Sequence, residues 1–161
     1  MKQSAGLLCY RLPEGAAPDQ PEVFLVHPGG PFWHNKDAHA WSIPKGEFTA
    51  GEEPLDAARR EFAEETGLDL QRIQWRSSFV PLPPLRQSSG KIVHAFAVEA
   101  DFDADDVRSN RFTLEWPPRS GQQREFPEVD RAAWFALDAA AEKLHAGQVT
   151  LMDSLRSLLR K

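Results

Sequence analysis

The stretch that decides the fold runs over residues 46–68 and reads GEFTAGEEPLDAARREFAEETGL. Its second part predicts a helix over about residues 53–66. Pro54 falls in the first turn, where a missing N–H costs nothing, and Gly67 follows the last turn as a C-cap. Apolar residues recur at helical spacing and predict a buried stripe on this helix; they are Leu55, Ala58 and Phe62.

Three carboxylates, Glu61, Glu64 and Glu65, fall on one side of the same predicted helix. Side chains so close repel one another unless a cation lies between them. Their oxygen atoms suit Mg²⁺ or Mn²⁺. Taken alone, the three residues also fit a solvated acidic helix face.

The surrounding residues complete a longer pattern, G-x5-E-x7-R-E-U-x-E-E-x-G-U, in which U is apolar. The match covers seven fixed and two apolar positions, so the stretch resembles the Nudix box and the chain resembles Nudix hydrolases. The resemblance implies an α/β/α sandwich with a mixed sheet, and a box that forms a loop–helix–loop. It also implies hydrolysis of a nucleoside diphosphate linked to another group, X.

The resemblance assigns roles to residues of the box. It implies that Glu61, Glu64 and Glu65 bind divalent cations and that the Gly46 carbonyl is a further ligand. Glu52 and Arg60 are expected to pair across the loop and hold the start of the helix.

Sequence outside the box bears on the substrate. Residues 41–46, WSIPKG, resemble the lead-in of asymmetrical diadenosine polyphosphate hydrolases and diphosphoinositol phosphatases. Lys45 is therefore expected to contact a phosphate, and Lys91 and Arg119 to add positive charge. Glu128 matches a glutamate that lies near the metals in diadenosine tetraphosphate hydrolases, which makes it a candidate fourth carboxylate ligand.

The resemblance implies a dinucleoside polyphosphate or a nucleoside triphosphate as substrate, with ADP-ribose or a nucleotide sugar as the alternative, and two features leave this choice open. The diadenosine branch has a tyrosine beyond its box where this chain has Pro84-Leu85-Arg86, so base stacking needs another side chain. Pro83 and Pro84 fall where ADP-ribose pyrophosphatases carry a proline, which favours that rival substrate. Core or loop packing also explains each aromatic candidate for stacking; these are Trp33, Trp41, Phe79 and Trp116.

Composition narrows the class of protein. The 161 residues carry 19 basic and 24 acidic side chains, a net charge of −5, which argues against a long nucleic acid or a membrane as partner. We expect one domain over residues 1–161, a small nucleotide substrate, and a monomer or homodimer. Cys9 is the one cysteine, so no intramolecular disulfide forms, and a cytoplasmic protein is expected. A Nudix module that binds nucleotides without hydrolysis is the alternative from another class.

Hydrophobic patterns predict elements in the rest of the chain. Residues 101–127 are polar and rich in proline, and we expect them to be mostly loop with a strand at 112–116. The other expected strands are 4–10, 22–27, 73–80, 91–99 and 133–135, and the other expected helices are about 138–144 and 149–159.

Overall fold

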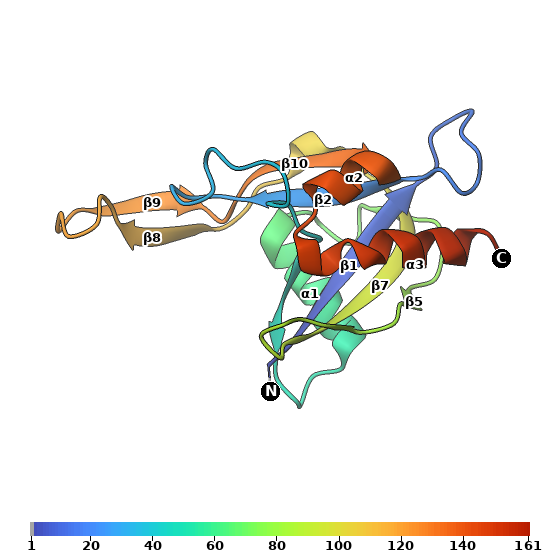
Figure 1. Ribbon diagram of the computed structural model, residues 1–161, viewed down its shortest axis with the longest axis horizontal. Coiled ribbons are helices and arrows are strands. Elements are labelled where there is room, and N and C mark those ends of the chain that lie inside the picture. The colour runs from blue at the N-terminus through green and yellow to red at the C-terminus, as the bar shows by residue number, and fades with distance from the viewer. Residues whose placement is uncertain (1) are drawn as a thin grey trace.

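A computed structural model describes residues 2–161 (Figure 1). The main sheet has the strand order β10-β2-β1-β7-β4, with β3 pairing β1 and with β5 and β6 pairing β7. Its strands are β1 (Gln3–Arg11), β2 (Glu22–Pro28), β3 (Lys45–Phe48), β4 (Gln74–Trp75), β5 (Val80–Pro81), β6 (Leu85–Arg86), β7 (Ile92–Asp101) and β10 (Val129–Ala136). The α-helices are α1 (Pro54–Thr66), α2 (Leu137–Lys143) and α3 (Thr150–Leu159).

The sheet is mixed, as the sequence predicts. Strands β1 and β7 run parallel, whereas every other pair in the sheet is antiparallel. Strand β1 is buried along residues 4–10, which is typical of a strand covered on both faces. Cys9 lies in this strand and is fully buried, so it belongs to the core.

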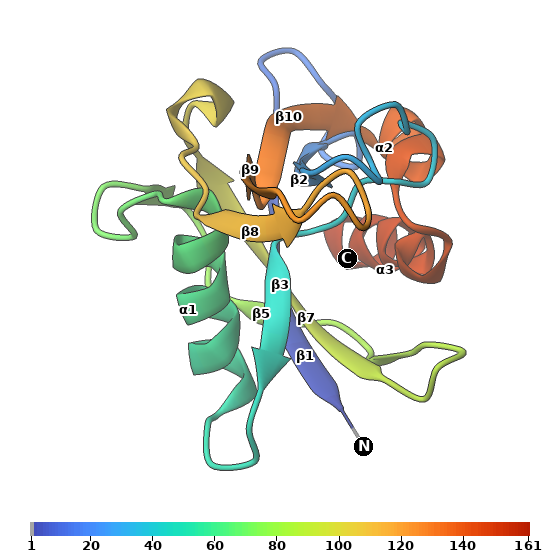
Figure 2. The same ribbon diagram turned by 90° about the vertical axis from the view of Figure 1, so that its left-hand side faces the viewer.

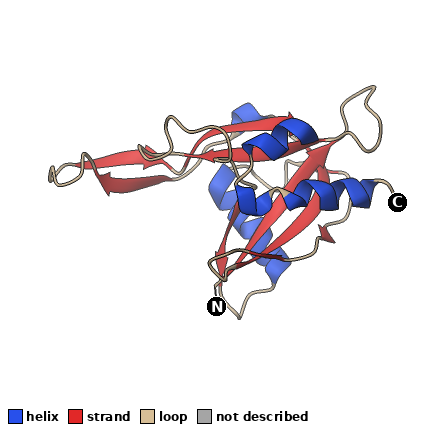
Figure 3. Cartoon of the chain, in the orientation of Figure 1, coloured by secondary structure: helices blue, strands red, loops and turns tan. Residues whose placement is uncertain are grey.

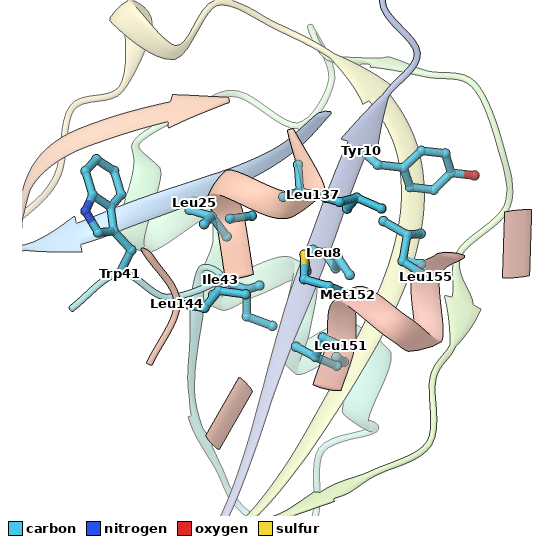
Figure 4. Close-up of a cluster of buried hydrophobic side chains, with 14 of the residues drawn as sticks. Leu8, Tyr10, Leu25, Trp41, Ile43, Leu137, Leu144, Leu151, Met152 and Leu155 are labelled. Carbon is cyan, nitrogen blue, oxygen red and sulfur yellow. The ribbon is translucent and has the colours of Figure 1, made fainter. Parts of the chain in front are cut away.

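Helices cover both faces of the sheet, which confirms the predicted α/β/α sandwich. Figure 2 shows α1 on one side and α2 and α3 on the other. Alternate residues of β1 feed the two cores, because successive side chains of a strand point to opposite faces. Leu7 and Cys9 join the cluster beneath α1, and Leu8 and Tyr10 join the cluster beneath α2 and α3 (Figure 4).

Helix α1 has the bounds that its sequence predicts. It begins at Pro54, and Gly67 ends it in the left-handed conformation, with φ of 69° and its N–H donating to the Ala63 carbonyl at 2.8 Å. Phe62 is fully buried and meets the rings of Phe24 and Phe102 edge-on. The apolar stripe therefore fixes α1 against the sheet, with Glu61 on the side of the helix next to β3.

Two expectations about strands are wrong. The predicted strand 73–80 is broken into β4 and β5, because the Ser77 hydroxyl, in place of a backbone carbonyl, accepts the Glu99 N–H at 2.8 Å. The strand expected at 112–116 is present as β8 (Arg111–Glu115), but the rest of 101–127 also contains β9 (Gln123–Pro127), which was not expected; the two strands make an antiparallel hairpin that extends from the body (Figure 3). Two 3-10 turns complete the chain, η1 (Ala104–Asp106) and η2 (Ala146–Gln148).

Candidate functional site

Strand β3 and helix α1 bring Gly46 against Glu61. Gly46 pairs with Ala5 of β1, and this pairing fixes the backbone of β3 next to α1. A Cβ placed on Gly46 would overlap the Glu61 carboxylate. Glycine is therefore required here so that the carboxyl group can reach the backbone of β3.

Arg60 holds the loop before α1 and also faces the acidic side of the helix. Its Nε and Nη2 bond the two oxygens of Glu52 at 2.9 and 3.0 Å, a bidentate arrangement. Its Nη1 lies 2.8 Å from Glu61 and 3.4 Å from Glu64. The guanidinium holds the pKa of the Glu52 carboxyl below its ordinary value, and it partly neutralises the crowded carboxylates.

Glu65 is partly buried, whereas Glu64 is exposed. Burial raises the pKa of its carboxyl to about 8, and the positive charge of Lys45 partly offsets this rise. The negative charges of Glu61 and Glu128 raise this pKa further, so the three carboxylates lie within electrostatic reach of one another. Burial and the charge of Lys91 in turn lower the pKa of the Lys45 ammonium.

A cleft of about 380 Å³ lies beside these residues. It brings together Lys45 from β3, Glu65 from α1 and Glu128, which directly precedes β10. Two consecutive elements and one distant segment of the chain therefore deliver one cation and two carboxylates to the same cleft. Its lining consists of Val26, Pro28, Trp33, Ala40, Ser42, Lys45, Glu65, Gln87, Glu128, Val129, His145 and Gln148.

Of the three residues expected to contact the substrate, Lys45 lines this cleft, whereas Lys91 and Arg119 do not. The Lys91 ammonium pairs with Glu47 at 3.3 Å and does not line the cleft. Arg119 is exposed in the turn between β8 and β9, at the far end of the projecting hairpin (Figure 1). The structure therefore does not bring Arg119 to the carboxylates.

Sequence reasoning missed the polar residues that close the cleft on the side of η2. Gln148 is buried; its Oε1 accepts the Ile43 N–H at 3.1 Å, and its Nε2 donates to the Ser42 hydroxyl at 2.9 Å. These bonds fix the segment that leads into Lys45. No local pattern links Gln148 to Ser42, because they are 106 positions apart.

The donor set fits a divalent cation. Carboxylate and carbonyl oxygens are hard ligands suited to Mg²⁺ or Mn²⁺. Because Gly46 has no side chain, the Glu61 carboxylate can approach the backbone of β3. Within residues 2–161 no three carboxylates already converge on one point, because Arg60 engages Glu61 and Glu64 while Glu65 lines the cleft. A cation would replace the guanidinium as their counter-charge.

Over residues 2–161, none of the helices combines the length and the apolar character needed to cross a bilayer.

Comparison with known proteins identifies the family of the chain. The family model described as NUDIX domain matches residues 15–155. Two proteins named RNA pyrophosphohydrolase are similar: that of Bartonella quintana is 58% identical over 112 residues, covering 63% of this chain and 60% of the relative. That of Bartonella henselae is 31% identical over 110 residues, covering 62% and 58%. The chain thus spans about three fifths of the length of these curated relatives.

Several solved structures are similar over nearly the whole chain, and one of them illustrates the likeness. It is a binary complex of an Ap4A hydrolase from C. elegans, with a TM-score of 0.67 and 22% identity, covering 98% of each chain. At this level of identity the likeness establishes the fold.

Proposed function

Since the chain belongs to the NUDIX domain family, we propose that it hydrolyses a phosphoanhydride bond in a nucleoside diphosphate linked to another group. The observation that carries the proposal is the convergence of Lys45, Glu65 and Glu128 on one cleft, beside the contact between Glu61 and Gly46. A cationic side chain and a set of hard oxygen ligands are what binding and cleavage of a charged phosphate chain require.

Five groups of the chain would hold Mg²⁺ or Mn²⁺: the carbonyl of Gly46 and the carboxylates of Glu61, Glu64, Glu65 and Glu128. When bound, such a cation supplies charge neutralisation at the phosphate oxygens and a more acidic water. Lys45 attracts the phosphate chain into the cleft, and a cleft carboxylate accepts the proton of the attacking water. Glu52 and Arg60 keep the start of α1 in place.

A dinucleoside polyphosphate is the substrate that we propose first. The lead-in WSIPKG supports this choice, and so does the position of Lys45 in the cleft. Purified protein would be incubated with Mg²⁺ and diadenosine tetraphosphate, and the products separated by chromatography. ATP plus AMP is the expected pair of products. ADP-ribose in a parallel tube tests the alternative substrate that Pro83 and Pro84 favour. Formation of AMP plus ribose phosphate would identify the protein as an ADP-ribose pyrophosphatase.

A second candidate substrate is RNA. The names of the two curated relatives favour it, and it would revise the expectation that no long nucleic acid is bound. An oligoribonucleotide with a 5′-triphosphate would be added as a third substrate. Conversion to the 5′-monophosphate, at a rate above that for diadenosine tetraphosphate, would move the proposal from dinucleotides to RNA ends.

The metal ligands are tested by Glu64→Gln and Glu65→Gln. Each removes one anionic ligand of the cation, so we expect a loss of turnover of more than about a hundredfold, with an unchanged circular dichroism spectrum. The matched control is Glu53→Gln, because Glu53 is exposed, adjoins α1 and makes no side-chain capping bond. Full activity of both variants would overturn the ligand assignment, as would full activity in a chelator. Nucleotide binding without turnover of any substrate would favour the non-catalytic module.

A further inference from the structure

The cleft has an apolar part in addition to its charged residues. Its apolar lining consists of Val26, Pro28, Trp33, Ala40 and Val129. Among the lining residues in the described chain, Trp33 and His145 carry aromatic rings; the Trp33 indole is the larger of the two, and Nδ1 of His145 accepts the Gly147 N–H at 3.2 Å. A cleft that joins carboxylates and a lysine to an indole has the chemistry to hold both parts of a nucleotide, the phosphates and the base.

Trp33 is not explained by core packing. It belongs to neither buried cluster, and 36% of its surface is exposed. The ammonium of Lys36 lies 5.1 Å from the centre of its ring. The adjacent Phe32 is more exposed, at 60%, but it packs edge-on against Trp116 and does not line the cleft. Trp33 therefore lines the cleft, whereas the neighbouring Phe32 packs against Trp116 outside it.

The loop that carries Trp33 is fixed to the sheet. The Trp33 carbonyl accepts the Lys36 N–H at 3.0 Å, and the Lys36 carbonyl lies 2.6 Å from Nε2 of His27. His27 is fully buried in β2, and its Nδ1 lies 2.7 Å from the Asp130 carboxylate. Since a carbonyl can only accept, Nε2 of His27 must carry a hydrogen. These bonds hold the turn at residues 33–36 before any ligand arrives.

We propose that Trp33 is the side chain on which the nucleobase of the substrate stacks. This inference rests on the proposed function for the identity of the ligand as a nucleotide. The base lies on the indole in the apolar part of the cleft, and the phosphates extend toward Lys45 and the carboxylates. Trp33 thereby takes the place of the tyrosine that is missing beyond the box.

The physical basis is stacking on a surface that is already in place. An exposed ring in a hydrogen-bonded loop loses little conformational freedom when a ligand binds. Stacking tolerates different bases, because each has a π-face. We therefore expect the cleft to require a base but to discriminate weakly among bases.

The test compares two ligands that differ in the base alone, AMP and ribose 5-phosphate. Calorimetric titrations in Mg²⁺ would be run on the wild type, Trp33→Ala, Trp33→Phe and Phe32→Ala. We expect Trp33→Ala to weaken AMP binding by about tenfold or more while ribose 5-phosphate binding is unchanged. Trp33→Phe should keep most of the affinity, since it keeps a ring, and Phe32→Ala should bind AMP as the wild type does.

Three results would overturn the inference: wild-type affinity of Trp33→Ala for AMP, equal losses for both ligands, or a wild type that binds the two equally. Because the titration needs no turnover, its outcome is separate from that of the hydrolysis experiment. If AMP binding depends on Trp33 but the protein hydrolyses no substrate, the proposed function is wrong and this inference still holds. In an active enzyme, Trp33→Ala should raise KM and leave kcat nearly unchanged.

Discussion

At the scale of single residues, specific contacts explain why the box requires particular residue types at particular positions. Gly67 adopts a φ of 69°, and a Cβ there would meet the Arg108 carbonyl, so the helix end needs glycine for both conformation and space. Gly46 is required for space alone, because the Glu61 carboxylate lies where its Cβ would be. Arg60 is required for its planar fork, which bonds both oxygens of Glu52.

Gly46→Ala should separate activity from stability. The added methyl group meets the end of a flexible side chain, so Glu61 moves away and the fold survives. We expect turnover to fall by about tenfold or more as a metal ligand is displaced, with a melting temperature close to the wild type. Gly51→Ala is the control, because a Cβ at Gly51 meets nothing within 4 Å. Equal activity of the two variants would contradict the role of Gly46.

The Cys9 thiol should be unreactive in the native protein. Its burial raises the pKa of the thiol far above neutrality, so the reactive thiolate is scarce and the sulfur is out of reach. Ellman's reagent at pH 8 should give no signal with native protein and one equivalent in guanidinium chloride. Rapid labelling without denaturant would show that β1 opens readily.

At the scale of elements, α1 carries two functions on two sides. Its buried stripe binds it to the sheet through Ala57, Ala58 and Phe62, and its acidic side faces Arg60 and the cleft. The helix has no side-chain cap at Glu53, so packing and the Glu52–Arg60 pair fix where it starts. The position of the acidic side chains therefore depends on the packing of the apolar ones.

Phe62→Ala should show this dependence. The ring is fully buried among three aromatic neighbours, and its removal leaves a cavity. The expected loss is about 3–5 kcal/mol of unfolding free energy, measured by guanidinium chloride denaturation. Ser78→Ala serves as an exposed control and should change stability by less than about 0.5 kcal/mol. A loss below about 1 kcal/mol for Phe62→Ala would contradict the packing described.

At the scale of the whole molecule, the sheet separates two buried clusters. One lies under α1 and the other under α2 and α3, and β1 contributes to both. The cleft lies where both layers meet the sheet, since Glu65 comes from α1 whereas His145 and Gln148 adjoin α3. A single cooperative unfolding transition is expected of such a shared sheet.

The two clusters should behave as energetically independent sites within that transition. Leu155→Ala, on α3, should cost about 2–5 kcal/mol. The double variant Phe62→Ala/Leu155→Ala should lose the sum of the single losses to within about 0.5 kcal/mol, because the side chains lie in separate clusters. Circular dichroism and tryptophan fluorescence should report one coincident transition. Should the probes diverge, the two layers unfold separately.

The sequence by itself determined the features that depend on neighbours along the chain. The period of the apolar residues and the signals at Pro54 and Gly67 located α1, and strict spacing identified the box and its glutamates. The long apolar strands β1, β2 and β7 were also predictable, because a continuous apolar run is sufficient to indicate them. The mixed α/β/α architecture followed from the resemblance that the box carries.

Only the tertiary structure decided which distant residues meet. In the folded chain Glu128 lies beside the same cleft as Lys45 and Glu65. Arg119 lies at the end of a hairpin, whereas Trp33 and Gln148 line the cleft. The tertiary structure also broke the strand at Ser77, where a side chain on one segment replaces a ladder bond of another. Such pairings are set by β-sheet register and by packing across the layers, and the local period of the sequence contains neither.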